Sequence, residues 1–270
     1  MSEFIAALPM YDWPERREEV DAEWRAIRDR LRGQGIAAPE RLTRRNADMP
    51  SVPGGIRDAG GALIAPDPAT LPSDELDLPT LWRHPGLLFA QACWGPLEAG
   101  LSGHVRVLGQ PDYSAFDGGQ GESYSSAILT RREGAAEERP PADGYAILPL
   151  DLLAGRRLAY NSPDSMSGII ALTRDLETLG EDIGTFAARI ETGGHRASIR
   201  AVAEGRADIC AIDCRSWAMA RRFDPAARAL SVVGWTARRK GLPYVASRLA
   251  PHFSLFAEKS TQGPVDFPRG

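Results

Sequence analysis

Two serines and a glycine lie in a segment that joins an expected strand to an expected helix. The segment reads Asn161-Ser-Pro-Asp-Ser165-Met-Ser167-Gly168, between an apolar stretch at 157–161 and a helical apolar pattern at 167–179. Unpaired backbone N–H groups at a helix start, together with serine hydroxyls, can bind an oxyanion. Serine is also a common helix N-cap, so plain capping is the alternative interpretation of this motif alone.

A histidine and an aspartate occupy similar strand-to-helix positions farther along the chain. His195 follows Gly193 and Gly194, which allow a backbone to approach a ligand closely, and Asp213 follows the apolar run 207–212. Ligands of open α/β sheets bind at the carboxyl ends of the parallel strands. We therefore expect both side chains to face the same crevice as the two serines, the alternatives being a surface histidine and a helix-capping aspartate.

A tyrosine completes this set of polar candidates. Tyr124, followed by Ser125 and Ser126, begins the alternating stretch that is expected to enter the same part of the molecule. From there its hydroxyl could close the crevice from the side. An ordinary half-buried strand tyrosine is the alternative.

The elements that must position these residues alternate between strands and helices. Strands are predicted at 4–8, 87–93, 105–108, 123–130, 157–161, 186–191, 207–212, 230–236 and 244–247, and helices at 15–31, 167–179, 196–204 and 215–222. This alternation predicts parallel pairing and a three-layer α/β fold. The stretch 44–79, rich in proline, glycine and aspartate, predicts a long irregular crossing of the kind that often borders a site.

The length and the composition limit the classes of function. A chain of 270 residues is long enough for two lobes, which we place at 1–110 plus 230–270 and at 111–229, the second carrying most of the oxyanion site. The net charge of −4 argues against a nucleic-acid partner. Three cysteines without a CxxC pair support neither a disulfide framework nor a structural zinc, and we expect no metal and no cofactor.

The beginning of the chain and its hydropathy bear on where the protein resides. Residues 1–8 lack the features of a secretory signal, and no stretch approaches about 18 uninterrupted apolar residues. We expect a protein that is not embedded in a membrane and, as written, a cytoplasmic one. A periplasmic protein whose leader had been trimmed would look the same.

Several motifs, taken together and in this order, resemble a known family. They are Leu8-Pro-Met-Tyr11-Asp, Ala90-Gln-Ala-Cys93, Gly121-Glu-Ser-Tyr124-Ser, Asn161 through Gly168, Gly194-His195-Arg-Ala-Ser198, Ala207 through Asp213, and Gly241-Leu-Pro-Tyr244. The chain resembles the phosphate, phosphite and phosphonate-binding proteins of ABC importers, which have the type 2 periplasmic-binding-protein fold. The resemblance implies two lobes, each a mostly parallel sheet flanked by helices, with a ligand cleft between them. It also implies a monomeric, periplasmic, non-enzymatic partner of an ABC permease that binds a small oxyanion.

The resemblance also assigns site residues. By analogy Ser165, Ser167, His195, Asp213 and Tyr124 contact the ligand, and Tyr11 lines the first-lobe face of the cleft. Met166 stands where relatives of known phosphonate specificity commonly carry a hydroxyl residue. The stretch 251–270 is short and weakly patterned where the family has helices that pack on the first lobe, so an incomplete first lobe is a further expectation.

Two other classes of protein compete with this interpretation. An enzyme could pair His195 with Cys210, Cys214 or Asp213 as nucleophile and base. However, Cys210 lies inside an apolar strand, and an acid beside Cys214 would raise the pKa of its thiol. A cytoplasmic effector-binding sensor would share the two-lobed fold, but no DNA-binding helix pair precedes residue 4.

Overall fold

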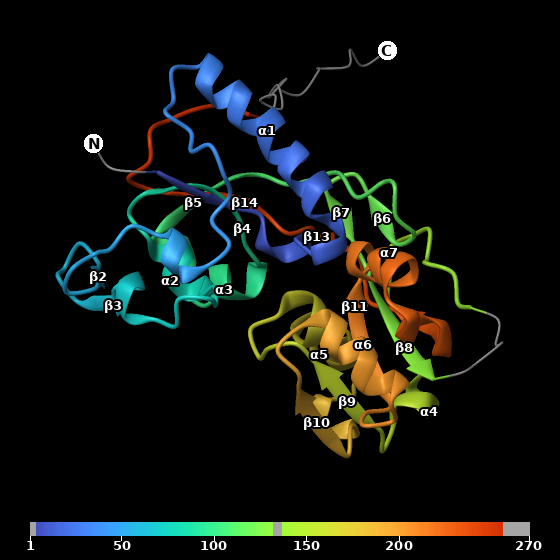
Figure 1. The fold of residues 1–270 in the computed structure, drawn as a ribbon. Coiled ribbons are helices and arrows are strands. Elements are labelled where there is room, and N and C mark those ends of the chain that lie inside the picture. The colour runs from blue at the N-terminus through green and yellow to red at the C-terminus, as the bar shows by residue number, and fades with distance from the viewer. Residues whose placement is uncertain (1–3, 132–136, 256–270) are drawn as a thin grey trace, which may run out of the picture.

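Two sheets, each covered by helices on both faces, form the two lobes of the molecule (Figure 1). The structure is a computed structural model that describes residues 4–131 and 137–255. The first sheet has the strand order β1 (Ile5–Ala7), β4 (Leu87–Gln91), β14 (Tyr244–Ser247) and β5 (Val105–Gly109). The second has the order β10 (Ala188–Glu191), β9 (Arg157–Tyr160), β11 (Ile209–Asp213), β8 (Ser126–Arg131) and β12 (Leu230–Trp235).

The first lobe is built around one long amphipathic helix. In α1 (Arg17–Gly33) the buried residues Val20, Trp24 and Leu31 repeat at helical spacing and pack on one face of the sheet. On that face Phe89 stacks on Tyr244 with ring centroids 4.8 Å apart. The shorter helices α2 (Leu78–Arg83) and α3 (Trp94–Glu98) cover the opposite face.

The second lobe repeats this three-layer arrangement. Its sheet is covered on one face by α4 (Leu150–Leu153) and α5 (Ala171–Thr178), and on the other by α6 (His195–Ala203) and α7 (Cys214–Phe223). A π-helical turn, η6 (Met166–Ile170), leads directly into α5. The remaining short turns are η1 (Pro9–Tyr11), η2 (Pro14–Arg16), η3 (Asn46–Asp48), η4 (Pro68–Thr70), η5 (Leu101–Gly103), η7 (Ile183–Thr185) and η8 (Pro225–Ala229).

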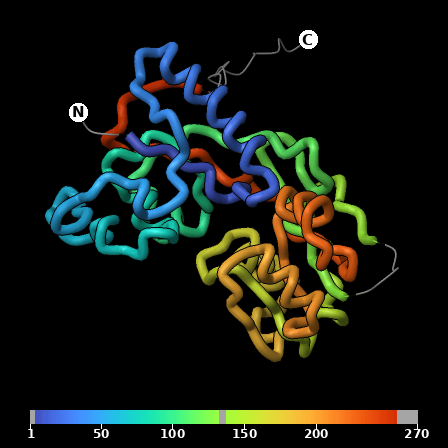
Figure 2. The backbone as a smooth tube through the Cα atoms, in the orientation of Figure 1, coloured from blue at the N-terminus to red at the C-terminus, as the bar shows by residue number. Residues whose placement is uncertain are grey.

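The chain passes between the lobes through a small sheet that belongs to neither. Strands β6 (Gly119–Gln120), β7 (Ser123–Tyr124) and β13 (Arg239–Lys240) pair in the order β13-β7-β6, so the outgoing and the returning segments are hydrogen-bonded to each other. Figure 2 shows these two segments side by side between the lobes. A separate hairpin of β2 (Ile56–Arg57) and β3 (Leu63–Ala65) lies on the first lobe.

The two-lobed α/β architecture is confirmed, but the expectation of mostly parallel sheets is wrong. Strands β1 and β4 are parallel, as are β10, β9 and β11, whereas β14, β8 and β12 run antiparallel to their neighbours. The antiparallel strands are those next to the crossings between the lobes. Strands β14 and β8 enter their sheets against the direction of the parallel strands, whereas β12 leaves the second sheet in the same direction as β11.

The return to the first lobe lies later in the chain than expected. Residues 230–235 form β12, which pairs with β8 in the second sheet. We therefore move the proposed boundary from residue 230 to the segment that follows Trp235. Residues 251–255 continue past β14, and Phe253 and Leu255 pack on the first-lobe core; residues 256–270 of the expected weakly patterned tail lie outside the described residues.

The two lobes touch on both sides of the space between them. The Gly95 backbone of α3 lies so close to Asp164 of the second lobe that a Cβ atom on Gly95 would be 1.8 Å from the Asp164 carbonyl oxygen. Beside this contact, Arg174 of α5 pairs with Glu98 at 2.6 Å. On the other side, Arg196 of α6 pairs with Glu15 at 2.7 Å.

Substitution of Gly95 tests whether this contact holds the lobes together. Because the Asp164 backbone has no room for a methyl group, Gly95→Ala should force the lobes apart and increase the radius of gyration measured by small-angle X-ray scattering. The matched control is Gly103→Ala, since a Cβ atom on Gly103 meets no atom within 4 Å. Equal radii for the two variants would contradict the described contact.

Candidate ligand-binding site

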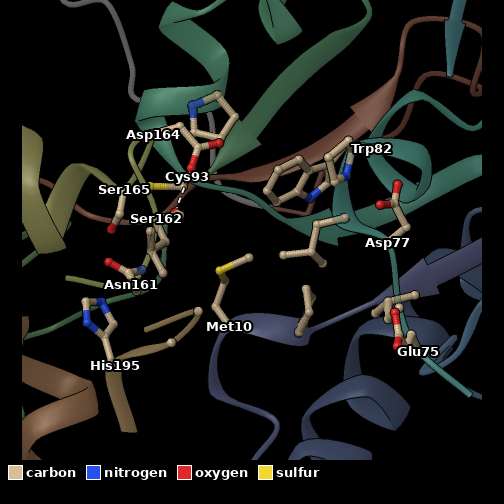
Figure 3. Close-up of a pocket in the computed structure, with 18 of the residues that line it drawn as sticks. Met10, Glu75, Asp77, Trp82, Cys93, Asn161, Ser162, Asp164, Ser165 and His195 are labelled. Carbon is tan, nitrogen blue, oxygen red and sulfur yellow. Dashed lines mark hydrogen bonds between the residues drawn. The ribbon is translucent and has the colours of Figure 1, made fainter. Parts of the chain in front are cut away.

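A cavity of about 700 Å³ lies between the lobes (Figure 3). Its second-lobe wall is formed by three strand-to-helix turns, at 161–167, 193–196 and 213–216. Its first-lobe wall includes Met10, Trp82 and the segment 71–79. The turns follow β9, β10 and β11, which are parallel neighbours, so their side chains meet at one edge of the sheet.

Ser165 lies in the first of these turns, directly before η6. It is the N-cap of η6, is only 3% exposed, and its Oγ accepts a hydrogen bond of 3.1 Å from the Gly168 N–H. The predicted capping role is therefore real. Because this bond occupies an oxygen lone pair, the hydroxyl hydrogen can still be donated to a ligand in the cavity.

A glycine is required at the base of the same turn. A Cβ atom on Gly168 would lie 1.9 Å from the Asn161 Oδ1 atom, so only glycine lets the asparagine side chain fold over η6. Asn161 lines the cavity. Within residues 4–131 and 137–255 its buried Oδ1 has no hydrogen-bond partner, which makes Asn161 a polar group that a ligand or water could satisfy.

Ser167 and Asp213 both contact the same nitrogen of His195. The Nε2 atom lies 2.8 Å from the Ser167 Oγ and 3.4 Å from the Asp213 Oδ2. The other ring nitrogen, Nδ1, is buried without a partner among the described residues. Burial lowers the pKa of His195 below its usual range, an effect that the neighbouring Asp213 carboxylate partly opposes. The imidazole is therefore neutral at pH 7, and protonation would turn Nδ1 into a donor for an anion.

The Asp213 carboxylate is buried and is held by donors from both lobes. Its Oδ1 accepts from the Ser216 N–H at 2.9 Å and from the Tyr11 hydroxyl at 3.1 Å. The Tyr11 hydroxyl lies 3.2 Å from that of Tyr113, which accepts from the Leu242 N–H. Since Tyr11 donates to the carboxylate, Tyr113 must donate to Tyr11. Burial, with Asp213 adding to it, raises the pKa of Tyr11 well above its usual range, so the hydroxyl keeps its proton.

A buried cation partly balances this carboxylate. The Arg215 guanidinium lies 4.2 Å from the centre of the Tyr11 ring and 3.6 Å from a Glu23 carboxylate oxygen. Arg215 is only 9% exposed and is absent from the cavity wall. Its charge therefore acts on Asp213 from behind Tyr11 and not from the cavity wall.

A family model described as "ABC transporter, phosphonate, periplasmic substrate-binding protein" matches residues 97–259. The chain belongs to this family. The matched range contains the three turns that form the second-lobe wall of the cavity. No protein with a curated function matches the sequence.

Solved structures of the phosphonate-binding family have the same fold. PhnD1 from Prochlorococcus marinus, solved in complex with methylphosphonate, is 16% identical with a TM-score of 0.55, over 90% of this chain and 75% of that one. A binding protein component of an ABC phosphonate transporter from Pseudomonas aeruginosa is 13% identical with a TM-score of 0.55, over 90% of this chain and 68% of that one. At these identities the likeness establishes the two-lobed fold.

The six residues assigned by resemblance to this family fall into two groups. Ser165, Ser167, His195 and Asp213 line the cavity, as expected from their strand-end positions. Tyr11 and Tyr124 are buried behind the wall and do not line it. Tyr11 contributes to the site by donating a hydrogen bond to the Asp213 carboxylate.

Tyr124 packs behind the wall. Its ring centre lies 5.2 Å from that of Tyr113. Its hydroxyl is near Ser167 but makes no hydrogen bond of good geometry within the described residues. Burial raises the pKa of this hydroxyl well above its usual range, so it stays protonated.

Met166 occupies the position where relatives were expected to carry a hydroxyl residue, and its side chain does not line the cavity. Its side chain is buried, with the sulfur 3.9 Å from an Arg174 nitrogen, and its backbone N–H donates to the Cys93 Sγ at 3.4 Å. A hydroxyl on this side chain would therefore not reach a ligand in the arrangement described.

The first-lobe wall of the cavity was only partly predicted from the sequence. The stretch 44–79 was expected to border a site, and Asn46 and residues 71–79 do line the cavity. Within that stretch the hairpin β2-β3 and the start of α2 were missed. A signal for α2 was present, because Asp77 precedes Pro79 and caps the helix by accepting from the Thr80 N–H.

The described residues hold no cluster of three or more histidine, cysteine or acidic side chains that could bind a metal ion. Likewise, no helix in the described ranges is long and apolar enough to cross a membrane. Burial raises the pKa values of the Cys210 and Cys214 thiols, and Asp213 adds to the effect at Cys214. Both thiols are therefore poor nucleophiles, in agreement with the prediction from their sequence positions.

The lowered pKa of His195 predicts a pH dependence of stability. The unfolded chain binds a proton near pH 6.5, whereas folded His195 resists protonation. The stability contributed by neutral His195 is therefore complete above about pH 6.5 and is lost as the pH falls toward the lower folded pKa. His195→Asn should reduce the loss of unfolding free energy between pH 7 and pH 5, measured by urea denaturation without ligand.

A second buried histidine provides the comparison. His84 also has a pKa lowered by burial, and its two nitrogens contact the Pro50 carbonyl oxygen and the Gly86 N–H. It remains in the His195→Asn variant, so part of the acid sensitivity should persist. Identical pH profiles for the wild type and the variant would mean that His195 titrates normally.

Proposed function

We propose that the protein binds a phosphonate, phosphite or phosphate monoanion between its lobes and delivers it to an ABC permease. The observation that carries this proposal is the convergence of Ser165, Ser167 and His195 on one wall of the cavity. The serine hydroxyls offer hydrogen-bond donors, and His195 adds one at Nδ1 when it is protonated. Arg196, which lies in the wall, is already paired with Glu15 and Asp224. Such a site holds an oxyanion through directed hydrogen bonds.

Asp213 selects the protonation state of the ligand. A carboxylate facing an oxyanion repels it unless a proton lies between the two. Asp213 Oδ1 already accepts two hydrogen bonds, while Oδ2 lies 3.4 Å from the His195 Nε2 atom. A monoanion with a P–OH group can supply that proton, whereas His195, whose pKa is lowered by burial, is neutral at pH 7. Fully deprotonated anions such as sulfate supply none.

The same geometry favours binding without turnover. In a Ser-His-Asp triad, the serine and the aspartate contact opposite nitrogens of the imidazole, so that the aspartate orients the base. Here Ser167 and Asp213 approach the same nitrogen, Nε2, and Nδ1 has no partner among the described residues. The aspartate therefore cannot hold the tautomer that would remove the serine proton. This supports a binding protein over a hydrolase.

Delivery to a permease and a periplasmic location rest on the family to which the chain belongs. Members are transporter components, and a two-lobed protein can signal occupancy by closing on its ligand. The contacts between Gly95 and Asp164 and between Tyr11 and Asp213 link the two lobes across the cavity. A ligand that prefers this arrangement would stabilise it.

Calorimetric titration with methylphosphonate, phosphite and phosphate tests the proposal. We expect at least one of them to bind, and Ser165→Ala to weaken that binding by more than about tenfold, because a hydrogen bond to a charged ligand is worth about 1.5–3 kcal/mol. Thr178→Ala is the control, since its hydroxyl bonds the Arg174 carbonyl oxygen on α5 outside the cavity. Flat titrations for all three ligands would refute the proposed function, and unchanged affinity in Ser165→Ala would limit Ser165 to capping.

Substitution of Asp213 tests the selection against sulfate. Asp213→Asn removes the charge and adds a donor, so sulfate binding should appear or strengthen while affinity for the protonated phosphorus ligand falls. The two ligands are titrated against the wild type and the variant at pH 7. If the wild type binds sulfate as tightly as the phosphorus ligand, Asp213 does not select the protonation state.

A further inference from the structure

The two walls of the cavity differ in chemistry. The second-lobe wall is polar, with Ser165 and His195 near one end of the view in Figure 3. The first-lobe wall is largely apolar and includes Met10, Leu71, Leu76, Leu78 and Trp82. Met10 lies between His195 and Trp82 in Figure 3, so the apolar surface begins next to the polar end and continues away from it.

The cavity is much larger than an oxyanion. Its volume of about 700 Å³ corresponds to about two dozen water molecules at ~30 Å³ each. Cavities of this size usually hold ligands with an extended organic body. A phosphate or methylphosphonate ion bound at Ser165 and His195 would leave the apolar first-lobe wall facing water, which is unfavourable for the closed protein.

The charges around the apolar wall limit what can fill it. Glu75 and Asp77 are on the same side of the cavity as Trp82, and the Asp77 carboxylate accepts a hydrogen bond from the Thr80 N–H at the start of α2. A second anionic group on the ligand would be repelled there. The apolar residues Leu76 and Leu78 alternate with these acids along the chain, so the wall suits a neutral, apolar substituent.

We propose that the ligand is an organophosphonate whose substituent is an uncharged alkyl or aryl group of about six to ten carbons. This inference rests on the proposed function, because the phosphonate group must occupy the polar end. The substituent then packs between Met10, Leu76, Leu78 and Trp82 of the first lobe. The second lobe selects the anion, and the first lobe selects the substituent.

Titration of a homologous series tests this assignment on the wild-type protein. Methyl-, butyl-, hexyl- and phenylphosphonate are compared by calorimetry at pH 7. Affinity should rise by roughly two- to fourfold for each buried methylene, so hexylphosphonate should bind at least about thirtyfold more tightly than methylphosphonate. Its binding should also have the more negative heat-capacity change, which marks burial of apolar surface.

A variant of the apolar wall provides the second test. Leu76→Ser should weaken hexylphosphonate binding by about tenfold or more and leave methylphosphonate within about twofold. Leu76 is only partly buried, which favours folding of the variant. The control is Leu63→Ser on the same lobe, because Leu63 is 60% exposed on β3 and lies outside the cavity.

The outcomes separate the two proposals. Equal affinities along the series, with methylphosphonate bound, would overturn the substituent site and keep the oxyanion site. Hexanesulfonate binding as tightly as hexylphosphonate would support the apolar wall and overturn the selection by Asp213. Flat titrations for every member would overturn both proposals.

Discussion

The buried carboxylate of Asp213 is the group on which the rest of the site depends. At 2% exposure it must be compensated, and its donors come from the α7 start and from Tyr11 of the first lobe. Tyr11 is in turn bonded to Tyr113, whose hydroxyl accepts from Leu242 where the chain returns between the lobes. The charge in the cavity wall is therefore also the charge that ties the lobes and the crossing segments together.

The direction of the strands explains why the polar groups gather on one wall. The three parallel neighbours β10, β9 and β11 end at the same edge, and each is followed by a helix or helical turn that begins with a site residue. The antiparallel strands β8 and β12 carry the chain toward and away from the other lobe. The polar cavity residues therefore follow the parallel strands of this sheet, whereas the connections to the other lobe are made by its antiparallel strands.

The local parts of this arrangement could be predicted from the sequence, and the non-local parts could not. Ser165, His195 and Asp213 stand at strand-to-helix turns that apolar spacing reveals, and α1 follows from the repeat of Val20, Trp24 and Leu31. A strand was predicted at 230–236, but its place in the second sheet depends on its pairing with β8, about a hundred residues away, and no local pattern encodes that pairing. The stretch 44–79 was expected to border a site, but the sequence did not show that its residues 71–79 would form the wall, because that role depends on the lobe opposite.

The strength of the contacts between the lobes indicates how much a bound ligand could contribute to closing them. In the Arg174–Glu98 pair the side chains are 46% and 47% exposed, and exposed pairs of this kind contribute only about 0–1 kcal/mol. This pair therefore adds little to the contact between the lobes, which depends more on the buried hydrogen bond between Tyr11 and Asp213. Serine and imidazole donors compete poorly with water in an open cleft, whereas in a buried cavity they bind an anion strongly. A ligand that bridges both walls would thus provide much of the free energy that closes them, and an oxyanion without a substituent would provide only the part that comes from the second lobe.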